Sequence, residues 1–149
     1  MNTINIRNKK STFEYHLNDI FEAGIVLLGS EIKSLRSNNG SIKEAYCVVK
    51  NGEVFIRNMY IKEYEKASFN IPDPKRERKL LLNRTEINKL EKGVKNQGVT
   101  IVPVKIFLSK KGQAKIQIAL ATGKKLYDKR EDLKNKDVKR DLDRIRKSF

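Results

Sequence analysis

The sequence predicts a small, mainly β protein, built as a closed or nearly closed barrel of about six strands with two or three short helices. One observation is that several short runs alternate apolar and polar residues, which is the period of a half-buried strand. Another is an Asn51-Gly52 pair between two β-type runs, which is typical of a tight hairpin. The 149 residues fit one domain, or one small domain followed by a tail.

The first half of this fold begins with a predicted strand. Residues 13–18 alternate apolar and polar side chains, and residues 21–28 continue as apolar β-type sequence. A short helix is expected over residues 31–36, with Ser30 as its N-cap and Glu31 near the positive end of the helix dipole.

Two hairpins are predicted. The first pairs residues 45–49 with residues 53–61 across the Asn-Gly turn. The second pairs residues 102–108 with residues 114–120, because apolar residues alternate along both runs and a Gly-containing loop joins them. The side chains of Lys105, Lys115 and Gln117 are expected on the opposite side of this second ribbon from its apolar residues.

A helix is predicted between the two hairpins. Asn83 is followed three positions later by Glu86, which is the spacing of a capping box with Asn in place of Ser or Thr. Ile87, Leu90 and Val94 then form an apolar stripe at helical spacing.

The charge of the chain indicates a polyanionic partner. There are 33 Lys and Arg against 18 Asp and Glu, a formal net charge of +15. An A/T-rich genome would enrich Lys, but such codon bias usually raises Glu and Asp as well. We therefore favour a nucleic acid as the partner, with a membrane surface or an acidic protein as alternatives.

The composition changes after Gly123, where few apolar residues remain. Residues 123–149 carry a net charge of +5, which leaves +10 on the rest of the chain. This tail is expected to be disordered alone and helical when bound, or else to be a solvated helix packed on the body. The predicted organisation is a flexible basic N-terminal arm (1–12), an RNA-binding barrel (13–122) and a basic C-terminal tail (123–149), in which Val138, Leu142, Ile145 and Phe149 share one helical face.

Several protein classes are excluded or disfavoured. No apolar run approaches the roughly 20 residues that span a bilayer, and the N-terminus has no secretory h-region. Cys47 is the only cysteine and is interpreted as a buried apolar residue, so a reducing, cytoplasmic location is expected. With one His and no phosphate-binding loop, we expect no enzyme activity, no cofactor and no metal. A metal-dependent RNA-processing enzyme that assembles acidic residues in space remains an alternative.

Five short motifs, in order and at characteristic spacing, make the chain similar to the SmpB family of SsrA-binding proteins over nearly its whole length. They are residues 21–27 (FEAGIVL), 31–36 (EIKSLR), 51–55 (NGEVF), 78–82 (RKLLL) and 123–130 (GKKLYDKR).

This resemblance implies a six-stranded antiparallel barrel similar to an OB fold, with three flanking helices. It implies binding to the tRNA-like domain of transfer-messenger RNA (tmRNA) and delivery of that RNA to stalled ribosomes. The protein would stand in for the anticodon arm of a tRNA. Its basic C-terminal tail would become helical in the decoding centre and the empty mRNA channel of the small subunit. No membrane contact and a monomeric state are expected.

The resemblance also implies site residues. The positions assigned to the tmRNA face are Asn8, Glu22, Arg36, Leu82 and Lys115. Those assigned to the decoding centre and mRNA channel are Gly123, Lys124, Lys125, Tyr127, Asp128, Lys129 and Arg130. Tyr127 stands where many members have His, and its ring could still stack on a base. The competing hypothesis is a general structured-RNA-binding or ribosomal protein with an OB-like barrel.

Overall fold

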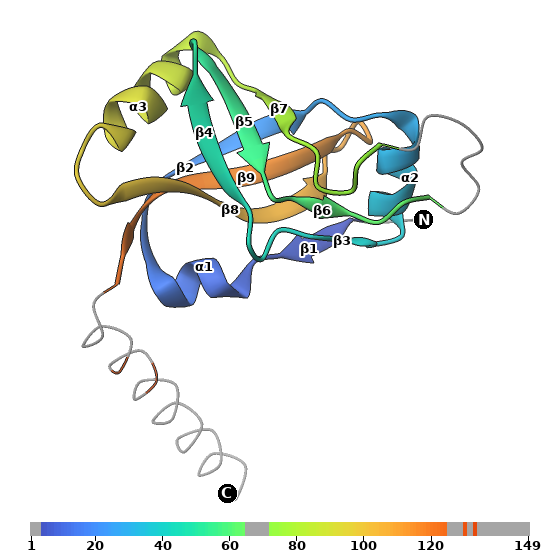
Figure 1. Cartoon of the computed structure of the whole chain (residues 1–149), viewed down its shortest axis with the longest axis horizontal. Coiled ribbons are helices and arrows are strands. Elements are labelled where there is room, and N and C mark those ends of the chain that lie inside the picture. Colours follow the sequence, from blue (N-terminus) through green and yellow to red (C-terminus); the bar gives the residue numbers. More distant parts are fainter. Residues whose placement is uncertain (1–3, 65–71, 125–129, 131–132, 134–149) are drawn as a thin grey trace, which may run out of the picture.

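The fold is mainly β, as the sequence predicts (Figure 1). The computed structural model describes residues 4–64, 72–124, 130 and 133. Within these residues the elements are β1 (Asn5–Arg7), α1 (Lys9–Glu14), β2 (Tyr15–Ile25), α2 (Gly29–Arg36), β3 (Gly40–Ser41), β4 (Tyr46–Lys50), β5 (Glu53–Arg57), β6 (Tyr60–Ile61), β7 (Arg78–Leu81), α3 (Arg84–Val94), β8 (Val99–Leu108) and β9 (Ala114–Gly123).

Six antiparallel strands close into a ring. The sheet order is β1-β8-β4-β5-β7-β2-β9, and β9 pairs again with β8. Since β9 occupies one edge of β8, β4 and β1 share the other edge: β4 pairs at Ile101, and β1 pairs at residues 105–107. The short strands β3 and β6 form a separate pair. The ring and the three helices confirm the expected antiparallel architecture.

Both predicted hairpins are present. In the β4–β5 hairpin, Asn51 and Gly52 adopt φ values of 51° and 74°, the left-handed conformations that a two-residue turn between twisted strands requires. In the β8–β9 hairpin, the Ser109 N–H donates to the Gln113 carbonyl at 2.8 Å, and Gly112 adopts φ 80°. These local turns fix the register of the strands on either side.

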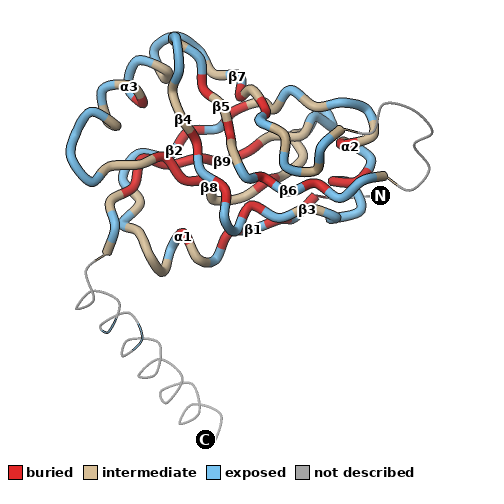
Figure 2. Tube along the Cα trace, viewed as in Figure 1, coloured by how far each residue is buried: buried red, intermediate tan, exposed pale blue. Residues whose placement is uncertain are grey.

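The core lies inside the ring. Alternate residues of β8 and β9 point inward and are fully buried, among them Ile106, Ile116 and Ile118. Figure 2 shows buried residues running along the strands, with exposed residues at the turns. Each such aliphatic side chain contributes about 1.5–3 kcal/mol to folding when it leaves water. Cys47 is buried as expected, and burial raises the pKa of its thiol.

Helix α3 packs against β8, β9 and β4 and begins where the sequence predicts. The Asn83 side chain accepts a hydrogen bond from the Glu86 N–H at 2.9 Å, and the Glu86 carboxylate accepts one from the Asn83 N–H at 3.3 Å. Leu90 is completely buried. Gly93 lets the helix approach closely, because a Cβ there would lie 2.7 Å from the side chain of Leu120.

Helix α2 begins two residues earlier than predicted. It spans Gly29–Arg36 and its N-cap is Leu28, so the assignment of Ser30 as N-cap is wrong. The Glu31 carboxylate accepts a hydrogen bond from the Leu28 N–H at 2.9 Å, which satisfies one free donor at the helix start. This acidic side chain supplies the cap that the leucine cannot.

The prediction of a flexible arm over residues 1–12 is wrong for the part of it that the structure describes. Strand β1 pairs with β8, and Ile4 and Ile6 are buried in the core. Residues 9–14 form α1, so the strand predicted from residue 13 begins only at Tyr15. The segment is ordered because β8 offers it a free edge roughly 100 residues later in the sequence.

The C-terminal tail lies mostly outside the described residues, including the predicted apolar stripe of Val138, Leu142, Ile145 and Phe149. Strand β9 extends through Gly123, which pairs with Tyr15. None of the helices among the described residues has the length and apolar content that crossing a bilayer requires.

Candidate nucleic-acid interface

Four neighbouring strands present one continuous outer surface. Glu22 on β2 lies opposite Gln117 on β9, Gln117 lies opposite Lys105 on β8, and Lys105 lies opposite Arg7 on β1. With strands about 4.8 Å apart, this row is about 14 Å wide. We call it and the adjoining Phe107 and Lys115 the cross-strand face.

Lys115 belongs to the second row of this face. It lies opposite Gly24 on β2 and Phe107 on β8. Because side chains alternate along a strand, Lys115 and Glu22 point to the same side of the sheet, away from buried Ile116 and Ala23. The structure therefore brings together two of the predicted site residues.

Cations dominate the cross-strand face. Arg7 and Glu22 are exposed, and Lys105 and Lys115 are half-buried. The Lys105 ammonium lies 5.5 Å from the centre of the Phe107 ring, which keeps a planar ring beside a positive charge. The face thus offers cations for phosphates, one carboxylate as a hydrogen-bond acceptor and one ring for stacking.

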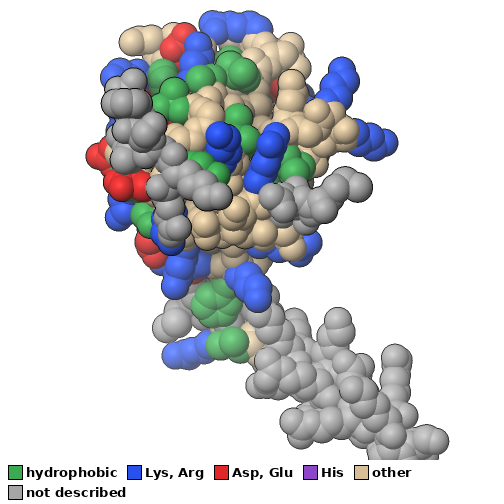
Figure 3. Space-filling model, turned by 90° about the vertical axis from the view of Figure 1, so that its right-hand side faces the viewer, with side chains coloured by type: hydrophobic (Ala, Val, Ile, Leu, Met, Phe, Trp, Pro, Cys, Tyr) green, Lys and Arg blue, Asp and Glu red, His purple; other side chains and the backbone are tan. Residues whose placement is uncertain are grey.

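Arg36 is exposed at the end of α2, near one edge of the cross-strand face. The Asn5 N–H on β1 donates to the Asn38 side chain at 2.9 Å, two residues after Arg36. This bond ties the end of α2 to the outermost strand of the face. In Figure 3, which views the molecule from the α2 end of Figure 1, Lys and Arg side chains are spread over the surface with hydrophobic side chains between them.

Asn8 supports the face from below. It is only 6% exposed. Its side-chain amide donates to the carbonyls of Ile42 at 3.2 Å and Pro103 at 3.0 Å, which joins β8 to the segment after β3. Its side-chain oxygen is buried without a partner among the described residues. Asn8 therefore holds β8 and the segment after β3 in their relative positions.

Leu82 does not lie on the cross-strand face. It follows β7 and packs, partly buried, against the core. The exposed apolar residue in this run is Leu81, 54% exposed, which lies opposite Gly24 and so extends the Lys115 row. Strand alternation within Leu80-Leu81-Leu82 is the sequence pattern that could have identified Leu81.

A buried ionic cluster anchors α2, and the sequence analysis missed it. Arg78 is fully buried and donates through Nε to a Glu31 carboxylate oxygen at 2.7 Å and through Nη1 to the Met59 carbonyl at 2.7 Å. Arg76 binds the same carboxylate. Burial alone raises the pKa of Glu31, but the hydrogen bonds from Arg76, the Leu28 N–H and Arg78 outweigh it and hold this pKa below its ordinary value.

The predicted decoding-centre residues are described only in part. Gly123 is exposed at the end of β9, and the Lys124 N–H donates to the Glu14 carbonyl at 2.7 Å, so the chain leaves the ring beside α1. Arg130 is helical and exposed. The tail starts at the end of the ring away from α2 (Figure 1). Outside the described residues lie Lys125, Tyr127, Asp128 and Lys129.

The part of the chain that the structure describes contains no group of three or more His, Cys, Asp or Glu side chains placed to hold a metal ion. His16 is exposed on β2, and Glu22 and Glu31 lie on different elements of the fold.

Comparisons with known proteins identify the family of this chain. A protein-family model described as "SmpB protein" matches residues 5–148. The chain is 52% identical to the SsrA-binding protein of Phocaeicola vulgatus, over 95% of each chain, and 52% identical to that of Cytophaga hutchinsonii, over 96% of this chain and 94% of the relative. A solved structure described as "tmRNA-SmpB: a journey to the center of the bacterial ribosome" matches with a TM-score of 0.70 and 38% identity, over 83% of this chain and 86% of the other. By these matches, which span nearly its full length, the chain belongs to the SmpB protein family.

Proposed function

We propose that this protein binds the tRNA-like domain of transfer-messenger RNA and carries it to ribosomes stalled in the cytoplasm. The observation that carries the proposal is the family match over residues 5–148, joined to the fold shared with a chain from a tmRNA–SmpB ribosome structure. The relatives named above are SsrA-binding proteins, and SsrA is the RNA that gives them their name.

The cross-strand face supplies the chemistry for this RNA. Arg36 and Lys115 suit phosphate oxygens or base edges, because both are cations without an ion pair among the described residues. Glu22 cannot bind a phosphate, so it accepts hydrogen bonds from a 2′-hydroxyl or a base amine. A strip about 14 Å wide matches the wide, shallow minor groove of A-form RNA better than a deep slot would.

Asn8 and Leu82 act in this proposal through their neighbours. Asn8 holds β8 in place beneath Lys105, and Leu82 fixes the end of β7 next to Leu81. Substituting either residue is expected to weaken RNA binding by disturbing the face.

The C-terminal tail serves the ribosome. Gly123 is the last residue of β9, and Lys124 and Lys125 follow it at once. The contacts assigned to the decoding centre and mRNA channel are Gly123, Lys124, Lys125, Tyr127, Asp128, Lys129 and Arg130. The rRNA of the small subunit is the polyanion that these cations would meet.

Competition at fixed salt tests the first half of the proposal. Labelled tmRNA bound to the protein is challenged with unlabelled tmRNA or with bulk tRNA, because affinities measured at different salt concentrations are not comparable. We expect tmRNA to compete at much lower concentration than tRNA. Equal competition would favour a general structured-RNA-binding protein instead.

Truncation tests the second half. A chain ending at Lys124 keeps the hydrogen bond to Glu14 and the whole of β9. We expect it to bind tmRNA like the full chain but to fail in tagging peptides on ribosomes stalled on an mRNA that lacks a stop codon. Loss of tmRNA binding in this variant would contradict the division between body and tail.

A further inference from the structure

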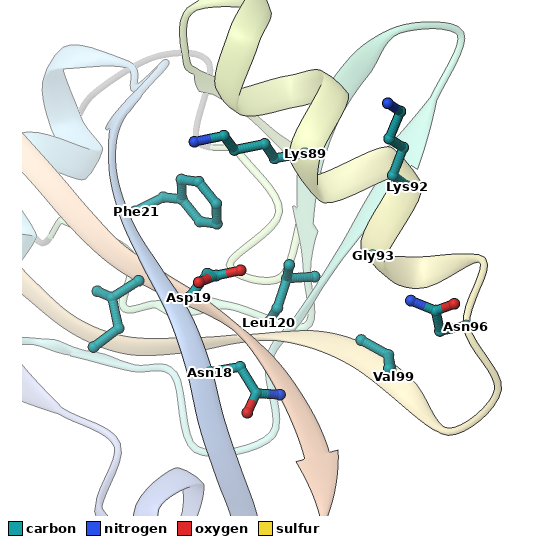
Figure 4. Close-up of a pocket in the computed structure, with 10 residues that line it drawn as sticks. Asn18, Asp19, Phe21, Lys89, Lys92, Gly93, Asn96, Val99 and Leu120 are labelled. Carbon is teal, nitrogen blue, oxygen red and sulfur yellow. The ribbon is translucent and has the colours of Figure 1, made fainter.

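A second surface feature lies apart from the cross-strand face. A hollow of about 660 Å³ opens between α3 and β2, with β9 and the start of β8 below it (Figure 4). Its volume is within the roughly 300–1,000 Å³ of small-ligand sites. Phe21 lines it from β2, whereas neighbouring Glu22 points to the cross-strand face. The two sites therefore lie on opposite sides of the same strand.

The floor of the hollow is apolar and preformed. Phe21 and Leu120 are 8% and 6% exposed, so the protein itself already holds these side chains in place. Gly93 on α3 contributes no side chain, and a Cβ there would collide with Leu120. The helix thus lies close to β9 at this point.

The rim is positively charged. Lys89 and Lys92 are three residues apart on α3, a spacing that places them on one side of the helix, and both are exposed. Neither makes an ion pair with a described residue, in contrast to Lys79, whose ammonium lies 3.0 Å from Glu53. These two ammonium groups are therefore available to an anion from outside.

Asp19 makes the hollow selective. Figure 4 shows its carboxylate on β2, between the labelled Phe21 and Leu120 and across from α3. A carboxylate among the lining residues repels a bare anion, and the paired lysines do not suit a purely apolar ligand. The arrangement fits a ligand with a phosphate at one end and a planar group carrying N–H donors at the other.

We propose that this hollow binds one unstacked nucleotide of an RNA strand. Lys89, whose side chain reaches toward Phe21 in Figure 4, binds its phosphate, and Lys92 adds positive charge at the rim. Its base lies over Phe21 and Leu120, and Asp19 accepts hydrogen bonds from the base edge. Guanine suits this acceptor best, since its Watson–Crick edge carries adjacent N–H donors. Unstacked bases read in this way are the usual targets of sequence-specific RNA recognition. The inference rests on the proposed function, and the nucleotide can belong to tmRNA or to ribosomal RNA.

A paired-variant experiment separates these sources. The full-length variant Lys89→Gln/Lys92→Gln is compared with Lys50→Gln/Lys75→Gln, which removes the same charge from two other exposed positions without an ion pair among the described residues. Each is titrated with the tRNA-like domain RNA and with small ribosomal subunits at several salt concentrations. We expect the first variant alone to bind one of the two RNAs roughly tenfold more weakly, with a salt slope lower by about 1–2. Equal affinities and slopes for both variants on both RNAs would overturn the proposal.

A thiol probe locates the contact. Asn96 is exposed and lines the hollow, and the native Cys47 is buried with a raised thiol pKa, so Asn96→Cys creates a single reactive thiol. We expect alkylation by iodoacetamide to slow in proportion to the fraction of protein bound by the RNA identified above. An unchanged rate in the saturated complex would place the RNA elsewhere.

The tail is the competing occupant, and the same probe tests it. Residues 123–149 carry a net charge of +5, which Lys89 and Lys92 repel. Alkylation at position 96 without RNA should therefore be equal in the full chain and in the chain ending at Lys124. Faster alkylation of the shorter chain would assign the hollow to the tail.

Asp19→Asn tests the base contact. Asp19 is exposed, so the substitution should leave the fold intact. It should remove the preference for guanine in short RNA oligomers and leave the salt dependence of RNA binding unchanged. An unaltered preference would overturn the role of Asp19. Each comparison uses matched variants and an RNA that the protein binds. A negative result would therefore contradict the nucleotide site in the hollow without contradicting the proposed function, which is tested by competition between tmRNA and tRNA.

Discussion

Two groups of cations in this protein are used in opposite ways. Arg76 and Arg78 surround Glu31 between α2 and the segment that leads into β7, and Arg78 is completely buried. Arg36 and Lys115 lie at the surface, and neither forms an ion pair with a described residue. The first group stabilises the fold, and the second leaves its charge available to RNA.

The number of Lys and Arg residues therefore does not by itself predict how tightly this protein binds RNA. Arg76 and Arg78 count among the 33 Lys and Arg, but Glu31 neutralises part of their charge, and a neutralised cation releases no counterion when RNA binds. The position of Glu31 decides which arginines belong to the fold. The variants below test whether the two groups act as separately as their surroundings indicate.

The largest expected effect comes from Arg78→Met. It leaves the buried Glu31 carboxylate with fewer donors and the Met59 carbonyl without its arginine, so we expect a loss of about 3–5 kcal/mol in the free energy of unfolding. Urea unfolding measures it. The double variant Glu31→Met/Arg78→Met removes both charges and should lose less than the sum of the single variants. A loss under about 1 kcal/mol for Arg78→Met would show that the Arg78–Glu31 pair contributes no more to stability than a surface salt bridge does.

Next in size is the loss of RNA affinity in Arg36→Ala and Lys115→Ala. Each removes one of the proposed phosphate or base-edge contacts, so we expect binding of tmRNA about tenfold weaker and a salt slope lower by about 1. Filter binding at several salt concentrations measures both quantities. The free energy of unfolding should stay within about 0.5 kcal/mol, since both changes are at the surface. A large loss of stability with unchanged RNA affinity would mean that Arg36 and Lys115 stabilise the fold and do not bind RNA.

Acid should act on the fold through Glu31. Its pKa is lower in the folded protein than in the unfolded chain, because Arg76, the Leu28 N–H and Arg78 stabilise the carboxylate against the opposing effect of burial. The resulting stability is fully present above the unfolded pKa of about 4.3 and is lost as the pH falls through the folded pKa. Unfolding by urea between pH 6 and about 3 should show a decline that is smaller in Glu31→Gln. If the free energy of unfolding falls equally with pH in both proteins, Glu31 does not contribute to the loss of stability in acid.

The smallest effect is expected from Asn83→Ala. Its side chain caps α3 by accepting the Glu86 N–H, so its removal should lower the free energy of unfolding by about 1 kcal/mol. Affinity for tmRNA should not change, because the cap belongs to neither group of cations. Both quantities are measured by the same two assays, and RNA binding that is weakened more than the loss of folded protein explains would show that Asn83 itself contributes to the RNA contact.

The elements with local determinants could be predicted from sequence. The Asn51-Gly52 turn, the capping box at Asn83 and the alternation in β8 and β9 each depend on residues close in the chain. Strand β1 could not be found in this way, because its partner β8 lies about 100 residues away. Strand β7 was missed because its run of Leu residues hides the alternation of a strand.

The candidate site was predictable in its residue types more than in its geometry. Register places Glu22 and Lys115 on one surface, and no local pattern gives that register. The resemblance places Asn8 and Leu82 on or under the RNA face; the structure buries Asn8 and packs Leu82, partly buried, against the core. The pairing of Glu31 with Arg76 and Arg78 joins positions about 45 residues apart, which only the folded chain reveals.

Strand β9 joins the cross-strand face to the start of the tail. Lys115 lies near one end of β9 and Gly123 at the other, about 27 Å apart at the usual rise per residue. Because β2 and β8 both pair with β9, the strand has no free edge along which it could bend or slip. Lys115 and Gly123 are therefore expected to move together as parts of one rigid strand. If Lys115 holds the RNA as we propose, any rotation of that RNA with the body turns the start of the tail through the same angle.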